Sequence, residues 1–131
     1  MLIRTIALAA ALLITSTASW AHHAFAAEFD VKKPIKLRGK VTKMEWINPH
    51  AWIHMDVADE SGMVHDWMIE CGAPNGLLRR GFTKASLPPG TEILVTGWRA
   101  KDDSFRANGS DITLPDGKML FLGSSNTDGA K

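Results

Sequence analysis

Two histidines near the start of the chain are the side chains best suited to chemistry. His22 and His23 follow Ala21, the last residue of a stretch with the features of a cleavable signal peptide. Cleavage after Ala21 would make His22 the N-terminus, whose amine and imidazole can chelate one metal ion while a second imidazole completes a three-nitrogen site that suits Cu(II). Cleavage one residue earlier would place His23 third, where an amine, two amides and its imidazole form a square-planar Cu(II) or Ni(II) site. Either terminus predicts copper, or another divalent metal, as the ligand.

His50 and His54 are the candidates for the additional imidazole. At about 3.3 Å per residue in a strand, their Cα atoms would lie about 13 Å apart, so the two are not expected to bind one ion together. His50 with His22, or His54 opposite Met68, is the more favourable arrangement. The alternative is that His54 and Met68 simply belong to an outer face of the sheet that the N-terminal segment covers.

Residues 1–21 are expected to be removed on export. They combine one basic residue, Arg4, with an apolar run over 6–14 and the small-x-Ala pattern that signal peptidase recognises; cleavage after Ala18 is the alternative. The apolar run is much shorter than the ~20 residues that span a bilayer, so no stable membrane insertion is expected after cleavage. This pattern predicts a periplasmic location.

Composition narrows the class of protein. Without Arg4, the 15 basic residues become 14, equal in number to the 14 acidic ones, so the charge balance does not favour nucleic acid as a partner. Cys71 is the only cysteine, which rules out an internal disulfide and predicts a buried apolar role for its thiol. Motifs of nucleophilic, zinc-protease or phosphate-loop enzymes are absent, so we expect a binding protein rather than an enzyme.

The elements that must position these histidines are mostly strands. Alternating apolar residues predict an all-β domain with one short helix, arranged as a five-stranded Greek-key barrel of the OB-fold type; another small barrel or sandwich is the alternative. The predicted strands cover 35–46, 51–57, 65–71, 91–100 and 105–114, with a helix over 74–80 and a short hairpin arm over 118–122. Residues 22–34 are predicted to form an extended arm, 35–122 the domain, and 123–131 a flexible tail.

The second and third strands can be registered against each other. Pairing Ile53 with Ile69 gives an all-apolar face, whereas a slip by one residue would pair apolar with polar residues throughout. This register gathers seven residues on the outward face: His50, Trp52, His54, Asp56, Asp66, Met68 and Glu70. An alternative function follows, in which Trp52, His54 and Met68, with Glu70 beside them, dock an envelope protein without any metal.

Several segments resemble one family of small proteins. The segments are AHHAFAAEFD (21–30), KVTKMEWINPHAWIHMDVAD (40–59), GAPNGLLRRGFTKASLPPG (72–90), GWRAKD (97–102) and ITLPDGKMLFLGSS (112–125). They resemble a family of secreted proteins of Gram-negative bacteria that is classed only as a domain of unknown function. The resemblance implies a periplasmic single domain and directs attention to His22, His23 and His50, but it implies no activity.

Overall fold

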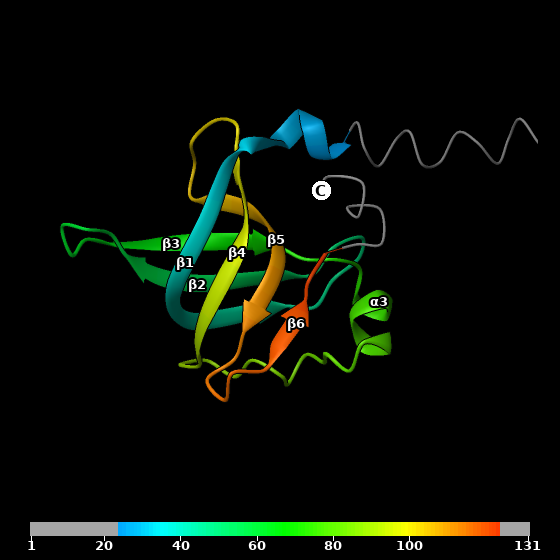
Figure 1. Ribbon diagram of the computed structural model, residues 1–131. Coiled ribbons are helices and arrows are strands. Elements are labelled where there is room, and N and C mark those ends of the chain that lie inside the picture. Colours follow the sequence, from blue (N-terminus) through cyan, green and yellow to red (C-terminus); the bar gives the residue numbers. More distant parts are fainter. Residues whose placement is uncertain (1–23, 124–131) are drawn as a thin grey trace, which may run out of the picture.

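Six strands and two short helical segments make up residues 24–123, the part of the chain that the computed structural model describes (Figure 1). The strands are β1 (Phe29–Glu45), β2 (Trp52–Ala58), β3 (Val64–Glu70), β4 (Glu92–Ala100), β5 (Arg106–Thr113) and β6 (Met119–Phe121). Residues 24–28 are helical, and α3 (Pro74–Arg79) follows β3. The predicted β-rich fold with a helix between the third and fourth strands is confirmed. The counts of five strands and one helix are wrong, because residues 24–28 form a helical turn and the predicted hairpin arm pairs with β5 as β6.

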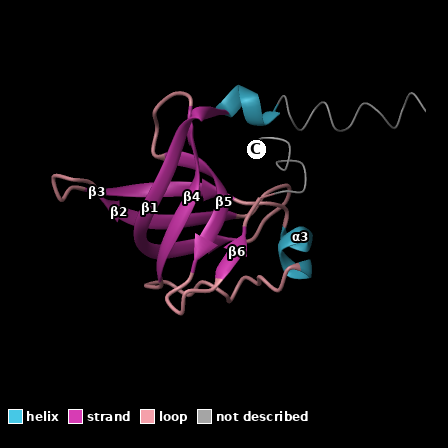
Figure 2. Cartoon of the chain, in the orientation of Figure 1, coloured by secondary structure: helices cyan, strands magenta, loops and turns pink. Residues whose placement is uncertain are grey.

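The strands lie in the order β3-β2-β1-β4-β5-β6, with each strand antiparallel to its neighbours (Figure 2). A short parallel pairing also joins β3 to β5. The long strand β1 pairs with β4 between Phe29 and Lys40 and with β2 between Lys40 and Glu45. A bulge lies between Val41 and Lys43. Gly39 lies so close to the carbonyl oxygen of Asp56 that a Cβ atom would overlap with it, which explains the glycine at this bend.

The β2–β3 hairpin has the register that the sequence predicts. Ile53 lies opposite Ile69 and Met55 opposite Trp67, and all four side chains are buried. One step further along, the Cys71 N–H donates to the Ala51 carbonyl at 2.8 Å. The Cys71 thiol is buried, and burial raises its pKa, so the prediction of an apolar role for this cysteine is confirmed.

The start of the described chain differs from the predicted extended arm over 22–34. Residues 24–28 are helical, and β1 begins at Phe29, six residues before the predicted strand. Phe29 is 2 % exposed, its ring lies 5.7 Å from that of Phe25, and the Lys101 N–H donates to the Glu28 carbonyl at 2.9 Å. Contacts with distant residues therefore order a segment whose own sequence has no clear period.

α3 begins at Pro74, as predicted, and ends one residue before the predicted end. Its Leu77 is buried in the core, while the arginines that follow, Arg79 and Arg80, are exposed. Figure 1 shows α3 on the side of the molecule opposite the tip of the β2–β3 hairpin.

Candidate functional site

His50 lies in the loop that joins β1 to β2, directly after the cis Asn48–Pro49 bond. Its Nδ1 atom is 2.9 Å from the carbonyl oxygen of Cys71. Because a carbonyl oxygen only accepts hydrogen bonds, Nδ1 must carry the proton and donate it. In the neutral ring, Nε2 is then the atom with a free lone pair. The side chain is 39 % exposed, so His50 is held in one tautomer and remains accessible.

Glu70, the last residue of β3, lies beside this imidazole. Its Oε1 atom is 3.9 Å from His50 Nδ1, and its side chain is only 14 % exposed. Burial raises the pKa of the Glu70 carboxyl, and the negative charge of Glu28 acts in the same direction. The positive charges of His50 and Arg106 and a hydrogen bond from Asn108 oppose the rise. A negative charge on Glu70 is therefore incompletely compensated, and a cation next to it would be stabilised.

Strand β5 contributes polar groups that the sequence analysis did not select. Asn108 lies opposite Glu70 in the parallel β3–β5 pairing and is 7 % exposed. Arg106 reaches Glu28, with Nη2 3.4 Å from Oε2. Within residues 24–123, the buried atoms Asn108 Oδ1 and Arg106 Nε have no hydrogen-bond partner. The region around the end of β3 therefore combines an accessible imidazole, a largely buried carboxyl with a raised pKa, and two buried polar atoms without a hydrogen bond.

The outward face of β2 and β3 is arranged as predicted. His54 lies opposite Met68 and Trp52 opposite Glu70, and all four are half-buried. His54 Nε2 is 3.4 Å from Glu45 Oε2, but within residues 24–123 this buried atom makes no hydrogen bond. The Lys43 ammonium donates to Glu45 at 2.7 Å and lowers the pKa of that carboxyl, and the nearby His54 acts in the same direction. His54 therefore contacts Glu45 on β1, whereas His50 contacts Cys71 and Glu70, so the two histidines have different partners, as their spacing predicted.

Residues 10–109 match one family model, described as a family of unknown function (DUF6152). The chain belongs to this family. The predicted resemblance to a domain of unknown function is thereby confirmed, and the match includes every candidate histidine together with Glu70 and Asn108. No curated protein and no solved structure matches the chain.

In this DUF6152 protein, two of the predicted metal ligands, His22 and His23, lie outside the described residues. Between residues 24 and 123, no group of three or more His, Cys, Asp or Glu side chains comes together in a way that would hold a metal ion. None of the helices in this range has both the length and the apolar character needed to cross a membrane.

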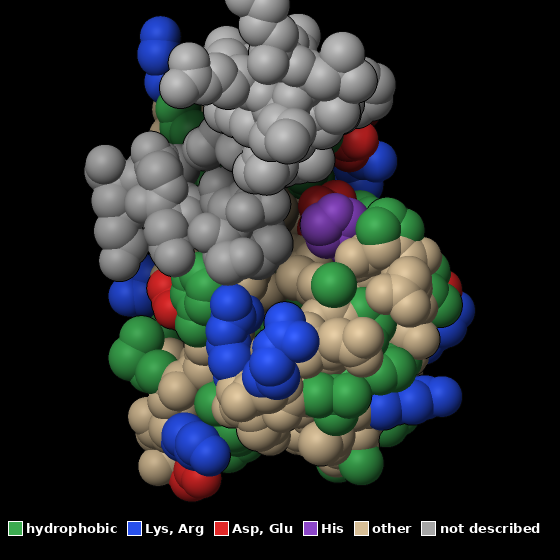
Figure 3. All heavy atoms as spheres, turned by 90° about the vertical axis from the view of Figure 1, so that its right-hand side faces the viewer, with side chains coloured by type: hydrophobic (Ala, Val, Ile, Leu, Met, Phe, Trp, Pro, Cys, Tyr) green, Lys and Arg blue, Asp and Glu red, His purple; other side chains and the backbone are tan. Residues whose placement is uncertain are grey.

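A cavity of about 350 Å³ beside α3 is a second feature that sequence reasoning missed. Arg79 and Arg80 line it together with Gly72, which is two residues beyond Glu70. These arginines were not predicted as site residues, because basic residues at the end of a helix usually complement its dipole. Figure 3 views the face that carries α3, where basic side chains, a histidine and an acidic side chain lie near one another.

Proposed function

We propose that this DUF6152 protein is a non-enzymatic binding domain that holds a divalent metal ion, with copper as the first candidate, through His50. One observation carries the proposal: His50 donates Nδ1–H to the Cys71 carbonyl and so presents an unprotonated Nε2. Metal-binding histidines usually donate their other ring N–H to a carbonyl or carboxylate, which sets the tautomer and the ring orientation. The hydrogen bond to Cys71 orients the ring, while the side chain stays 39 % exposed and is therefore accessible to a ligand.

Glu70 supports the choice of a cation. Its half-buried carboxyl lies beside the imidazole, and burial raises its pKa. A metal ion near His50 Nε2 would favour the ionised carboxylate and offset the desolvation of that charge. Glu70 acts here through its charge, and His50 is the ligand.

His22 and His23 are the proposed further ligands, because one imidazole and one carboxylate do not make a tight site for copper. Only residues 24–27 separate His23 from Glu28 in the sequence. Glu28 is close enough to Glu70 for its charge to raise the pKa of that carboxyl, and it contacts Arg106. The described chain therefore begins near the end of β3, at the side of the domain where His50 lies.

The location of the site supports an OB-fold interpretation. Through the β3–β5 pairing, the first five strands are connected in a ring, β3-β2-β1-β4-β5. OB folds bind ligands on the outer face of their second and third strands and in the loop between the first two. Here that loop carries His50 and the third strand ends at Glu70. We also propose export to the periplasm, with removal of residues 1–21, since only a free amine at or next to His22 would complete the metal site.

The test uses the full sequence, expressed in a Gram-negative host with its own leader, and mass spectrometry of the product to define its N-terminus. One equivalent of Cu(II) should give a single type 2 EPR signal with nitrogen hyperfine coupling. His50→Ala should change this spectrum and weaken binding about tenfold or more, whereas the control His65→Ala should leave it unchanged, since His65 is bonded to Asp59 at the far end of β3. A signal that His50→Ala does not change would overturn the proposed site.

The second candidate function is a protein-interaction module on the outward face. Trp52 and Met68 face outward on neighbouring strands and are only half-buried, so their apolar area is available to a partner in the envelope. Trp52→Ala should then abolish capture of that partner and leave copper binding intact. Met63→Ala is the control, because Met63 is 62 % exposed but lies in the β2–β3 turn. Equal loss of capture in both variants would contradict this candidate.

A further inference from the structure

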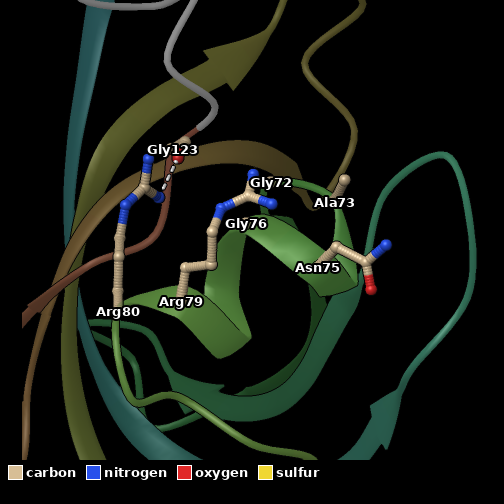
Figure 4. A pocket seen from close by; sticks show the side chains of 7 residues that line it. All are labelled: Gly72, Ala73, Asn75, Gly76, Arg79, Arg80 and Gly123. Carbon is tan, nitrogen blue, oxygen red and sulfur yellow. Dashed lines mark hydrogen bonds between the residues drawn. The ribbon is translucent and has the colours of Figure 1, made fainter.

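The cavity beside α3 has a lining with a marked excess of positive charge. Two arginines, Arg79 and Arg80, and the amide of Asn75 line it together with small residues, and none of its lining residues within 24–123 is acidic. Its volume of about 350 Å³ lies at the lower end of the range for small-molecule sites, about 300–1,000 Å³. Figure 4 shows the guanidinium groups of both arginines pointing to the same side, toward Gly72 and Gly123.

Arg80 is fixed in place by its own contacts. Its Nη1 donates to the Gly123 carbonyl at 2.6 Å, and its guanidinium carbon lies 4.7 Å above the centre of the Phe121 ring. These contacts use one of its five N–H groups and hold the plane of the guanidinium. An anion entering the cavity would therefore meet an arginine that loses little side-chain entropy on binding.

The Arg79 side chain is less constrained than that of Arg80. Within residues 24–123 it makes no hydrogen bond, and neither arginine forms an ion pair, whereas Lys33, Arg38 and Lys43 elsewhere on the domain are paired with acids. Two uncompensated guanidinium groups that line one small cavity leave a local charge of two without a counter-charge from residues 24–123. This charge, and not the shape alone, defines the ligand class.

The number of donors separates two kinds of anion. One guanidinium fork satisfies a carboxylate, which has one charge and two oxygens. Two guanidinium groups suit a phosphate group, which carries a charge of about −1.5 to −2 and three strong acceptor oxygens near neutral pH. We propose that this cavity binds the phosphate group of a small molecule between Arg79 and Arg80, with the rest of the molecule beside Asn75.

The site is independent of the metal site, because no residue is shared between them. Its test is a titration of the purified protein, expressed from the full sequence, with inorganic phosphate and with glycerol phosphate. NMR should detect shifts of the Gly72, Gly76 and Gly123 amide signals that saturate with phosphate and not with chloride at equal ionic strength. Arg79→Gln should weaken binding about tenfold or more, as expected for a lost charge-assisted hydrogen bond.

Arg38→Gln is the matched control, since Arg38 pairs with Glu92 on the outer surface of the sheet. Arg79→Lys retains the charge and should lose less affinity than Arg79→Gln if charge dominates. Because the Arg79 side chain makes no hydrogen bond or ion pair with residues 24–123, its variants should unfold at the wild-type temperature. Vesicles of phosphatidylglycerol form a separate arm: binding to them that Arg79→Gln removes would support the phosphate assignment and identify a lipid as its source.

Three results would overturn the proposal. The first is equal shifts with phosphate and chloride, and the second is an equal effect of Arg79→Gln and Arg38→Gln. The third is tighter binding of succinate than of phosphate, which would make the cavity a carboxylate site. Loss of copper binding in His50→Ala with phosphate binding intact would show that the two sites are separate and that either can fail alone.

Discussion

Two histidines lie beside carboxylates at opposite ends of β3, and they contrast in almost every physical respect. At the hairpin end, His65 Nε2 is 2.8 Å from Asp59 Oδ2, and the His65 ring stacks on Phe105 with a centroid distance of 4.1 Å. At the other end, next to α3, His50 lies 3.9 Å from Glu70, and its Nε2 atom makes no hydrogen bond with residues 24–123. Figure 1 shows β3 running from the tip of the hairpin toward the side of the molecule that carries α3.

The two carboxyls differ in the same way. Bonds from Ser61 and then from His65 lower the pKa of Asp59, although desolvation acts against them. Burial is the largest effect on Glu70, whose pKa is raised. The fold thus stabilises the ionised form of Asp59, whereas it destabilises the ionised form of Glu70. A histidine–carboxylate pair that is closely hydrogen-bonded, such as His65 and Asp59, stabilises a turn. A pair whose hydrogen-bonding groups are not all used, such as His50 and Glu70, is suited to a binding site.

Substitution of Ile69 tests whether both ends of β3 are held in place by the same hydrophobic core. Its side chain is fully buried directly beside Glu70, so Ile69→Ala should leave a cavity and lower the free energy of unfolding by about 2–5 kcal/mol, measured by urea denaturation. The exposed Met63 provides the control, and Met63→Ala should change stability by less than about 0.5 kcal/mol. Similar effects of the two substitutions would contradict the observed register.

Replacing each histidine by alanine shows which of the two histidine–carboxylate pairs contributes more to stability. His65→Ala removes both the bond to Asp59 and the stacking on Phe105, and should destabilise the protein by on the order of 1 kcal/mol. His50→Ala removes one hydrogen bond from a more exposed ring, and should have less than about half that effect. Equal losses in urea denaturation would mean that His50 also serves the fold.

The pH dependence of stability should have opposite signs at the two ends. Because folding raises the pKa of Glu70, the folded state binds its proton more tightly, and this carboxyl lowers stability as the pH rises above about 4.5 through the folded pKa. Glu70→Gln should therefore match the wild type in acid and be more stable at neutral pH. Thermal unfolding at several pH values measures the difference.

Asp59→Asn is the paired control for that experiment. Its carboxylate stabilises the fold above the usual pKa of about 3.8, and this contribution is lost as the pH falls below that value. The substitution should therefore destabilise the protein at neutral pH and have little effect in acid. A Glu70→Gln profile that resembles the Asp59→Asn profile would remove the contrast between the two carboxyls.

The smallest expected difference between the two ends of β3 is in the tautomers of His50 and His65. His50 should carry its proton on Nδ1, since that atom donates to the Cys71 carbonyl, and His65 should carry it on Nε2, which donates to Asp59. Nitrogen-15 chemical shifts of the two rings, recorded above the pKa of both, distinguish these forms. The same tautomer in both histidines would contradict the proposed role of His50 Nε2.

Sequence patterns were sufficient for features that depend on local alternation. The register of Ile53 with Ile69 and the start of α3 at Pro74 were both predicted, because the first follows from apolar periodicity and the second from the position of a proline. The beginning of β1 was not predicted. Phe29 owes its position to contacts with Phe25 and with residues near 100, which no local pattern contains.

The candidate site shows the same division. His50 and Glu70 were both selected from the sequence as outward residues, but nothing in their spacing connects His50 to the Cys71 carbonyl. Asn108 and the cavity residue Arg79 were not selected at all. Asn108 reaches the site because β5 lies parallel to β3, and Arg79 lines a separate cavity together with Gly72.

The sequence by itself determined which side chains face the core, because burial of apolar area depends on a period of two that can be read directly from the chain. It also determined the family. Only the tertiary structure decided which polar groups are left without partners, since hydrogen bonds and desolvation depend on neighbours that lie far away in the chain. His50 and His65 are both histidines near an acid, and only the fold pairs one of them with a turn carboxylate and leaves the other partly exposed beside Glu70.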